Sequence, residues 1–171
     1  MELVGFHGTT VKDASIILKE GFKCSDKTSW LGKGVYFFED LKSVFDGYAD
    51  AEKWCSIVKK LKSYAILRAI IKSDNVFDLV NDEHDRKRYK KIYEELYRIH
   101  LEKGYPAEAF KLYTVFNIIG ESVDVIRCIV DGKKYNTIPR NYVTMIPQIQ
   151  ICVCNNTSTV ICDIKKEKEV V

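Results

Sequence analysis

The residues near the start of the chain that are best suited to chemistry are His7, Gly8 and Thr9, which stand in succession. His7 ends a short apolar run, residues 2–7, that we expect to form a strand, and Gly8 and Thr9 follow it. A ring nitrogen, a hydroxyl and backbone N–H groups can converge on one ligand there, and glycine lets a ligand approach the backbone closely. Taken alone, the same residues are also typical of a capped strand-to-helix turn with an exposed histidine.

A second candidate segment runs from Trp30 to Phe38 and contains two glycines, Gly32 and Gly34, separated by one residue. The glycines lead directly into an aromatic run, residues 35–38, that we expect to form another strand. By itself this pattern predicts a turn before a buried strand. Because this segment follows His7, Gly8 and Thr9 in this order and at this separation, a site shared by the two segments is the better interpretation.

Together these segments resemble the catalytic domain of ADP-ribosyltransferases of the diphtheria-toxin and poly(ADP-ribose) polymerase type. In that family an H-G-[ST] motif on the first strand precedes a helix ending in G-F, a variable loop and G-x-G-[VIL]-Y-F. The corresponding residues here are 7–9, 21–22 and 32–37. The similarity is close over residues 1–40, loose over the last predicted strand and absent from the helical middle. Small stand-alone microbial members are the most similar.

The resemblance implies a set of contacts with NAD as co-substrate. His7 would hydrogen-bond a ribose, and Gly8 and Thr9 would hold the nicotinamide carboxamide. Tyr36 would present its aromatic face to the nicotinamide ring, under a loop formed by residues 23–31. A second aromatic residue of the following helix would complete the stack, with Tyr48 as the candidate and Phe45 and Trp54 as alternatives.

The chain departs from the family at the catalytic acid. The family carries a glutamate on a late strand, and the corresponding residue in 146–154 is Gln148. Strand alternation places Gln148, Gln150 and Cys152 on one face. Glutamine can hydrogen-bond a ribose hydroxyl, but it carries no charge to stabilise the cation that forms when the glycosidic bond breaks. We therefore expect slow turnover, and faster nicotinamide release with glutamate at 148.

Three explanations for Gln148 remain open. The chain is an engineered Glu-to-Gln inactive form, a natural member that uses glutamine or another acid such as Glu121, or a natural pseudoenzyme. The first needs the fewest assumptions, because the other motifs are intact. With His7 and Tyr36, Gln148 completes the set of expected catalytic residues.

The resemblance implies an NAD-dependent mono-ADP-ribosyltransferase, of toxin or defence-effector type, that modifies a protein, RNA or DNA. A neutralising antitoxin would be a further partner. The alternative is a catalytically inactive module that binds NAD or ADP-ribose in the same pocket. A third interpretation, an RNA 2′-phosphotransferase-like protein, would need several arginines around a phosphate, and the six arginines of this chain are scattered.

Strands and a helical insert must position these residues, and their mixed order indicates an α+β fold. From the resemblance we expect a split β core of short, mostly antiparallel strands with flanking helices and a helical insert. Residues 1–164 form one domain in this interpretation, and residues 165–171 form a charged, frayed tail. The strands are expected at 2–7, 35–38, 64–71, 123–130 and 146–154, with a hairpin turn at 131–132; the helices are expected at 10–21, 41–60, 89–104 and from Pro106 onward.

Composition excludes several classes of protein. The 171 residues suit one domain, and no apolar run approaches the length of about 20 residues that a membrane helix needs. No secretory signal is recognisable, so we expect a cytoplasmic protein without a membrane partner. The net charge of +3 neither indicates nor excludes nucleic acid, and the basic residues at 86–91 are flanked by acidic ones, as on a solvated helix face. The six cysteines show no C-x-x-C spacing, so we expect no metal site.

These features predict that all six cysteines are free thiols. A cytosolic environment keeps thiols reduced, and buried thiols resist oxidation. Thiol titration of the denatured, non-reduced protein should therefore count six. A count of four or fewer would contradict the prediction.

Overall fold

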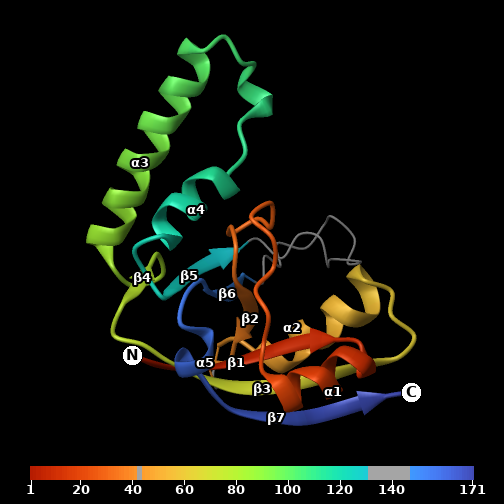
Figure 1. The fold of residues 1–171 in the computed structure, drawn as a ribbon. Helices are drawn as coiled ribbons and strands as arrows, with labels where there is room; N and C mark the ends of the chain where they lie inside the picture. Colours follow the sequence, from red (N-terminus) through yellow and green to blue (C-terminus); the bar gives the residue numbers. More distant parts are fainter. Residues whose placement is uncertain (42–43, 131–146) are drawn as a thin grey trace.

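The computed structural model of this protein describes residues 1–41, 44–130 and 147–171. Seven strands within these ranges form one sheet in the order β4-β5-β6-β2-β1-β3-β7 (Figure 1). Every neighbouring pair is antiparallel except β4 and β5. The fold is α+β, as the sequence predicts. The strands are β1 (Glu2–Thr9), β2 (Val35–Glu39), β3 (Tyr64–Lys72), β4 (Val76–Asp78), β5 (Val125–Val130), β6 (Gln148–Val153) and β7 (Ile161–Val170).

The helices lie on both sides of this sheet, and one of them projects away from it. Figure 1 shows the long helix α3 extending beyond the strands, with α4 between α3 and β5. In the part of the chain that the structure describes, no helix is both long and apolar enough to cross a membrane. The helical elements are α1 (Val11–Glu20), α2 (Gly47–Lys53), the π-helical turn η1 (Trp54–Val58), α3 (Glu83–Glu102), the 3₁₀ turn η2 (Ala107–Ala109), α4 (Tyr113–Gly120) and α5 (Thr157–Val160).

Helix α1 begins and ends where the sequence predicts. The Asp13 backbone N–H donates to Thr10 Oγ1 at 3.0 Å, and the Thr10 hydroxyl donates back to the Asp13 carboxylate at 2.8 Å. This reciprocal pair satisfies one free N–H of the first turn. Gly21 has φ +82°, a conformation that favours glycine, and it ends the helix.

The starts of three expected helices are wrong. The helix expected at 89–104 begins at Glu83. The helix expected from residue 41 begins at Gly47, because the Asp46 carboxylate caps it by accepting from the Ala49 N–H at 2.8 Å. Pro106 starts only a 3₁₀ turn, and the helix expected there begins at Tyr113. Strand β4 was not expected. The hairpin turn at 131–132 lies outside the described residues.

The expected frayed tail is also wrong, because residues 165–170 belong to strand β7. This strand pairs with β3 from Ile71 opposite Ile161 to Tyr64 opposite Val170. Backbone hydrogen bonds hold a strand whatever its side chains are, and charged residues are common on a sheet edge, where they discourage pairing with other chains. The Lys168 ammonium also pairs with the Glu52 carboxylate of α2.

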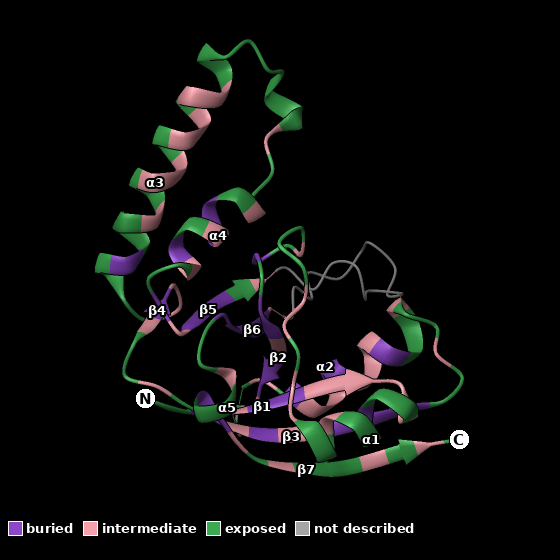
Figure 2. Cartoon of the chain, viewed as in Figure 1, coloured by how far each residue is buried: buried purple, intermediate pink, exposed green. Residues whose placement is uncertain are grey.

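Each face of the sheet has its own apolar core, and Figure 2 shows buried residues concentrated along the strands. On one face α2 covers Phe6 and Phe38, while α4 covers Ile126 and Cys152 of the neighbouring strands. On the other face α1 packs against the start of β3, through Ala14. The strands therefore carry apolar residues on both faces, which explains their continuous apolar runs.

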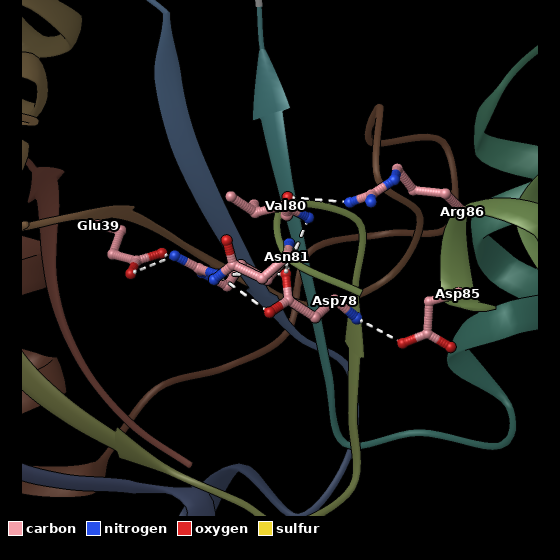
Figure 3. Close-up of polar contacts among 7 residues, drawn as sticks. Glu39, Asp78, Val80, Asn81, Asp85 and Arg86 are labelled. Atoms are coloured by element: carbon pink, nitrogen blue, oxygen red, sulfur yellow. Dashed lines mark hydrogen bonds and ion pairs between the residues drawn. The ribbon is translucent and has the colours of Figure 1, made fainter. Parts of the chain in front are cut away.

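A buried ion-pair network lies across three strands of the sheet (Figure 3). The Arg127 guanidinium of β5 donates to both Glu39 carboxylate oxygens of β2, at 2.6 and 2.9 Å, and to Asp78 of β4, at 3.0 Å. All three side chains are at most 7 % exposed. Asp78 also accepts from the Val80 N–H, and its own N–H donates to the buried Asp85 carboxylate. The network joins β5, β2 and β4 through groups that water does not reach.

Substituting Arg127 should therefore destabilise the fold strongly. The Arg127→Ala variant leaves two buried carboxylates without a cation, and we expect the free energy of unfolding to fall by about 3–5 kcal/mol. Urea denaturation followed by circular dichroism measures this change. The matched control is Arg98→Ala, which removes an exposed pair with Glu102 and should cost about 0.5 kcal/mol or less. Equal losses in the two variants would contradict the structural role of Arg127.

Candidate functional site

The candidate site lies where strands β1 and β2 separate. Strand β1 pairs with β3 along its whole length, but with β2 only at Gly5 and Phe6. Beyond this point a side chain takes the place of the backbone ladder, because His7 Nδ1 lies 2.8 Å from the Tyr36 carbonyl oxygen. The two expected motif segments therefore meet at the split.

A cavity of about 450 Å³ opens at this split. This volume is within the range typical of sites for small organic ligands. Its wall comes from β1, β2, the loop between α1 and β2, the turn η1 and strand β6. The lining residues are His7, Gly8, Lys23, Ser25, Ser29, Trp30, Gly34, Val35, Tyr36, Phe37, Phe38, Trp54, Lys59 and Gln150.

His7 presents a neutral imidazole to the cavity. Burial lowers its pKa below the usual value, against the opposing effect of the hydrogen bond with the Tyr36 carbonyl. A carbonyl oxygen can only accept, so Nδ1 carries the proton and Nε2 is left as an acceptor. The ring is also held edge-on by Phe22, with centroids 5.1 Å apart. His7 Nε2 is therefore available to accept a hydrogen bond from a ligand hydroxyl.

Tyr36 lines the cavity, but its hydroxyl holds the neighbouring loop. It donates to the Gly32 carbonyl at 2.6 Å and accepts from the Leu31 N–H at 3.0 Å. Burial raises the pKa of this phenol well above its usual value. The hydroxyl is therefore committed to the loop, and the ring face is the part of Tyr36 that can meet a ligand.

The loop over residues 23–31 lies beside the cavity, as expected from the resemblance. Lys23, Ser25, Ser29 and Trp30 from this loop line the cavity. Asn117 of α4 anchors the loop, because its amide donates to the Lys27 carbonyl at 2.8 Å and accepts from the Lys33 N–H at 2.9 Å.

Two motif glycines are required by close packing. A Cβ on Gly8 would lie 2.5 Å from Cys55 Sγ and 2.7 Å from the Ala51 carbonyl oxygen. A Cβ on Gly34 would lie 2.3 Å from Cys152 Sγ. Real Cβ atoms do not approach other atoms so closely. Glycine at these positions lets α2 pack closely against Gly8 and β6 pack closely against Gly34, on the two sides of the split.

The structure does not bring every expected aromatic residue to the cavity. Tyr48, on α2, packs edge-on against Phe6 with centroids 5.7 Å apart and does not line the cavity. Phe45 and Thr9 do not line it either. Of the two alternatives to Tyr48, Trp54 is the one that reaches the cavity, because it begins the π-helical turn after α2.

The two glutamines of β6 occupy different surroundings. Gln150 lines the cavity, and its Oε1 accepts from the Trp30 indole N–H at 3.1 Å. Gln148, the expected position of the acid, does not line the cavity. It is 3 % exposed, and its buried Oε1 has no hydrogen-bond partner among the described residues. Glu121, the alternative acid, follows the last turn of α4 and is exposed.

Sequence reasoning missed several residues of the cavity. Trp30 stands two residues before Gly32 of the glycine motif, and Gln150 shares the strand face of Gln148, so both carried a usable signal. Lys23 falls within the loop expected over residues 23–31 but was not singled out. Lys59 carried no signal, because an isolated lysine in a polar segment looks like a solvent-exposed residue. Lys59 Nζ lies 5.1 Å from the Trp54 ring centroid, a cation–π distance. No arginine among the described residues lines the cavity.

Comparison with known proteins adds one distant relative. The chain is 28 % identical over 180 residues to the uncharacterized protein MJ0359 of Methanocaldococcus jannaschii, covering 88 % of this chain and 81 % of the relative. No family model matches the chain. No solved structure matches it either. These comparisons assign no role to the candidate site, so its geometry is what supports it.

The lowered pKa of the partly buried His7 predicts a pH dependence of stability. Because the folded protein holds His7 neutral while the unfolded chain binds a proton near pH 6.5, stability is fully present above that pH and is lost as the pH falls below it. The His7 share of the loss is at most about 1.4 kcal/mol per pH unit. Urea unfolding between pH 7.5 and 5.5 measures it.

The His7→Asn variant should lose this share of the pH dependence, because asparagine does not titrate. The exposed His84 is the matched control, and His84→Asn should keep the pH dependence of the unsubstituted protein. An unchanged pH dependence in His7→Asn would contradict the burial of a neutral imidazole.

Proposed function

We propose that this protein is an NAD-dependent mono-ADP-ribosyltransferase. The observation that carries the proposal is the convergence of His7, Gly8 and Tyr36, from two separate motif segments, on one cavity at a strand split. The resemblance to ADP-ribosyltransferases rests on these same segments. Membership in a fold would not by itself support an activity, but the residue types in the cavity match the parts of NAD.

The cavity offers complementary groups to each part of the dinucleotide. The rings of Trp30, Tyr36 and Trp54 suit the flat nicotinamide and adenine rings. The neutral His7 suits a ribose hydroxyl. Lys23 and Lys59 are the lysines of the lining, and their ammonium groups suit the two negative charges of the pyrophosphate.

The reaction breaks the bond between the nicotinamide nitrogen and the ribose C1′ carbon. The bonding electron pair goes to the ring nitrogen, which becomes neutral, and positive charge develops on the ribose. An acceptor oxygen then forms the new bond to C1′ and gives its proton to solvent. Holding the leaving ring and the ribose in fixed positions lowers the barrier, because the reacting groups are already oriented.

A catalytically inactive module that binds NAD or ADP-ribose is the second candidate function. The neutral Gln150 in the cavity wall favours it, because no carboxylate lines the cavity among the described residues. Both candidates require NAD binding, and they differ in whether nicotinamide is released. Transfer of a single unit is favoured over polymer synthesis, which needs a carboxylate to activate the acceptor hydroxyl.

Binding of NAD should quench the intrinsic fluorescence. Trp30 and Trp54 are the two tryptophans of the chain, and both line the cavity. The fluorescence should therefore report occupancy directly during titration with NAD. The His7→Ala and Tyr36→Ala variants should each bind about tenfold more weakly, the equivalent of one lost hydrogen bond or ring contact.

One control tests whether the effect is specific to cavity residues, and a second tests which variants act on the phosphates of NAD rather than on its rings. His84→Ala should bind NAD as tightly as the unsubstituted protein. Lys23→Gln with Lys59→Gln should weaken NAD but not nicotinamide riboside, which lacks the pyrophosphate. The absence of quenching by NAD, or unchanged affinity in both cavity variants, would contradict the proposed function.

A further inference from the structure

The loop between α1 and β2 forms part of the cavity wall, but its backbone makes few hydrogen bonds of its own. Ser29 and Trp30 of this loop line the cavity. The Gly32 N–H donates to the Ser29 carbonyl in a turn at 2.7 Å, and the Ser25 N–H donates to the Gly34 carbonyl at 2.8 Å. Side chains from outside such a loop must therefore fix its shape.

Asn117 of α4 binds this loop at two points, one on each side of Trp30. Its Nδ2 donates to the Lys27 carbonyl at 2.8 Å, and its Oδ1 accepts from the Lys33 N–H at 2.9 Å. Lys27 and Lys33 each stand three residues from Trp30, so one side chain closes the loop across its apex. The two partners also fix which end of the amide is which, because a carbonyl oxygen accepts and an N–H donates.

Gly32 lets Asn117 come this close to the loop. A Cβ on Gly32 would lie 2.6 Å from Asn117 Oδ1 and 3.1 Å from the Asn117 backbone nitrogen. The φ of Gly32 is +80°, a conformation that residues with a Cβ rarely adopt. The first glycine of the glycine motif is therefore required by the contact with α4, whereas Gly34 is required by the contact with β6.

The ring of Trp30 is held by the same helix and by β6. Its centroid lies 6.4 Å from that of Phe116, the neighbour of Asn117, in an edge-on arrangement. Its indole N–H donates to Gln150 Oε1 at 3.1 Å. Trp30 is 41 % exposed, so these contacts, rather than enclosure in a core, keep the ring at the cavity wall.

We propose that Asn117 is a positioning residue for the NAD site and acts through Trp30. By closing the loop over residues 27–33, it holds the Trp30 ring at the cavity wall in the free protein, so that NAD binding does not have to order the loop. Asn117 itself does not line the cavity. It comes from the helical middle of the chain, to which the resemblance to ADP-ribosyltransferases does not extend. This inference rests on the proposed function.

The anchoring of the loop can be tested without any ligand. In Asn117→Ala the Lys33 N–H loses its acceptor, so amide hydrogen exchange over residues 27–34 should become about tenfold faster, while exchange in β1 and β3 stays unchanged. Asn75→Ala is the matched control. It removes an asparagine amide that donates to the Ser122 carbonyl at 3.1 Å and does not line the cavity, and it should leave exchange over residues 27–34 unchanged.

Isothermal titration calorimetry of the same variants measures the effect on NAD binding. The Kd of Asn117→Ala should rise about tenfold, because binding must then order the loop, and that of Asn75→Ala should not change. Asn117→Asp has the same shape and keeps the acceptor for Lys33, but it turns a second oxygen toward the Lys27 carbonyl. Its Kd should therefore also rise, by about tenfold.

A double-variant cycle tests whether Asn117 acts through Trp30. In the Trp30→Ala background, adding Asn117→Ala should weaken NAD binding less than about threefold further, because the ring that Asn117 positions is already absent. A merely structural role of Asn117 would weaken NAD binding by the same factor with and without Trp30.

The outcomes separate this inference from the function on which it rests. An unsubstituted protein that binds no NAD contradicts the proposed function, and the inference falls with it. If NAD binds, an unchanged Kd in Asn117→Asp or additive effects in the double-variant cycle overturn the inference alone. Unchanged exchange over residues 27–34 in Asn117→Ala also overturns it. If Asn117→Ala does not fold, the isosteric Asn117→Asp takes its place in both measurements and in the cycle.

Discussion

The buried guanidinium of Arg127 is the constraint on which the arrangement of this sheet depends. A cation removed from water must meet its anions closely, and here Glu39 and Asp78 meet it from strands on either side of β5 and β6. These contacts fix the end of β2 relative to β5. The aromatic residues of β2 and Gln150 of β6 form part of the cavity wall. Because the network fixes β2 relative to β5, it also helps to position this wall.

The cavity follows from the way β1 leaves β2. After two paired residues the strands separate, and the hydrogen bond from His7 to the Tyr36 carbonyl joins them beyond the ladder. Gly8 and Gly34 let the neighbouring elements pack closely on either side. The residues of the two motifs thus have structural tasks as well as a proposed role in binding NAD. A motif of this kind indicates a site only together with the geometry around it.

The polar residues behind the cavity bear on the choice between a transferase and a binding module. With Gln150 in the wall, the described residues of the cavity present hydrogen-bonding groups and aromatic rings but no carboxylate. Asp50 of α2 is a buried carboxyl group, and its burial raises its pKa above the usual value. In the engineered-form explanation, Gln148 replaces a lost acid.

The α+β class, helix α1 and the motif strands were determined by the sequence alone, because local patterns specify them: short apolar runs for the strands, and Thr10 and Gly21 at the two ends of the helix. The place of Trp54 rather than Tyr48 at the cavity depends on how α2 packs against Phe6 and Gly8. The pairing of Arg127 with Glu39 and Asp78 and the hydrogen bond between Trp30 and Gln150 join residues far apart in the chain. Strand β7 likewise forms only because β3 offers an edge to residues whose own composition is that of a solvated tail. Such contacts have no local signal, since they exist only once the sheet has brought distant segments together.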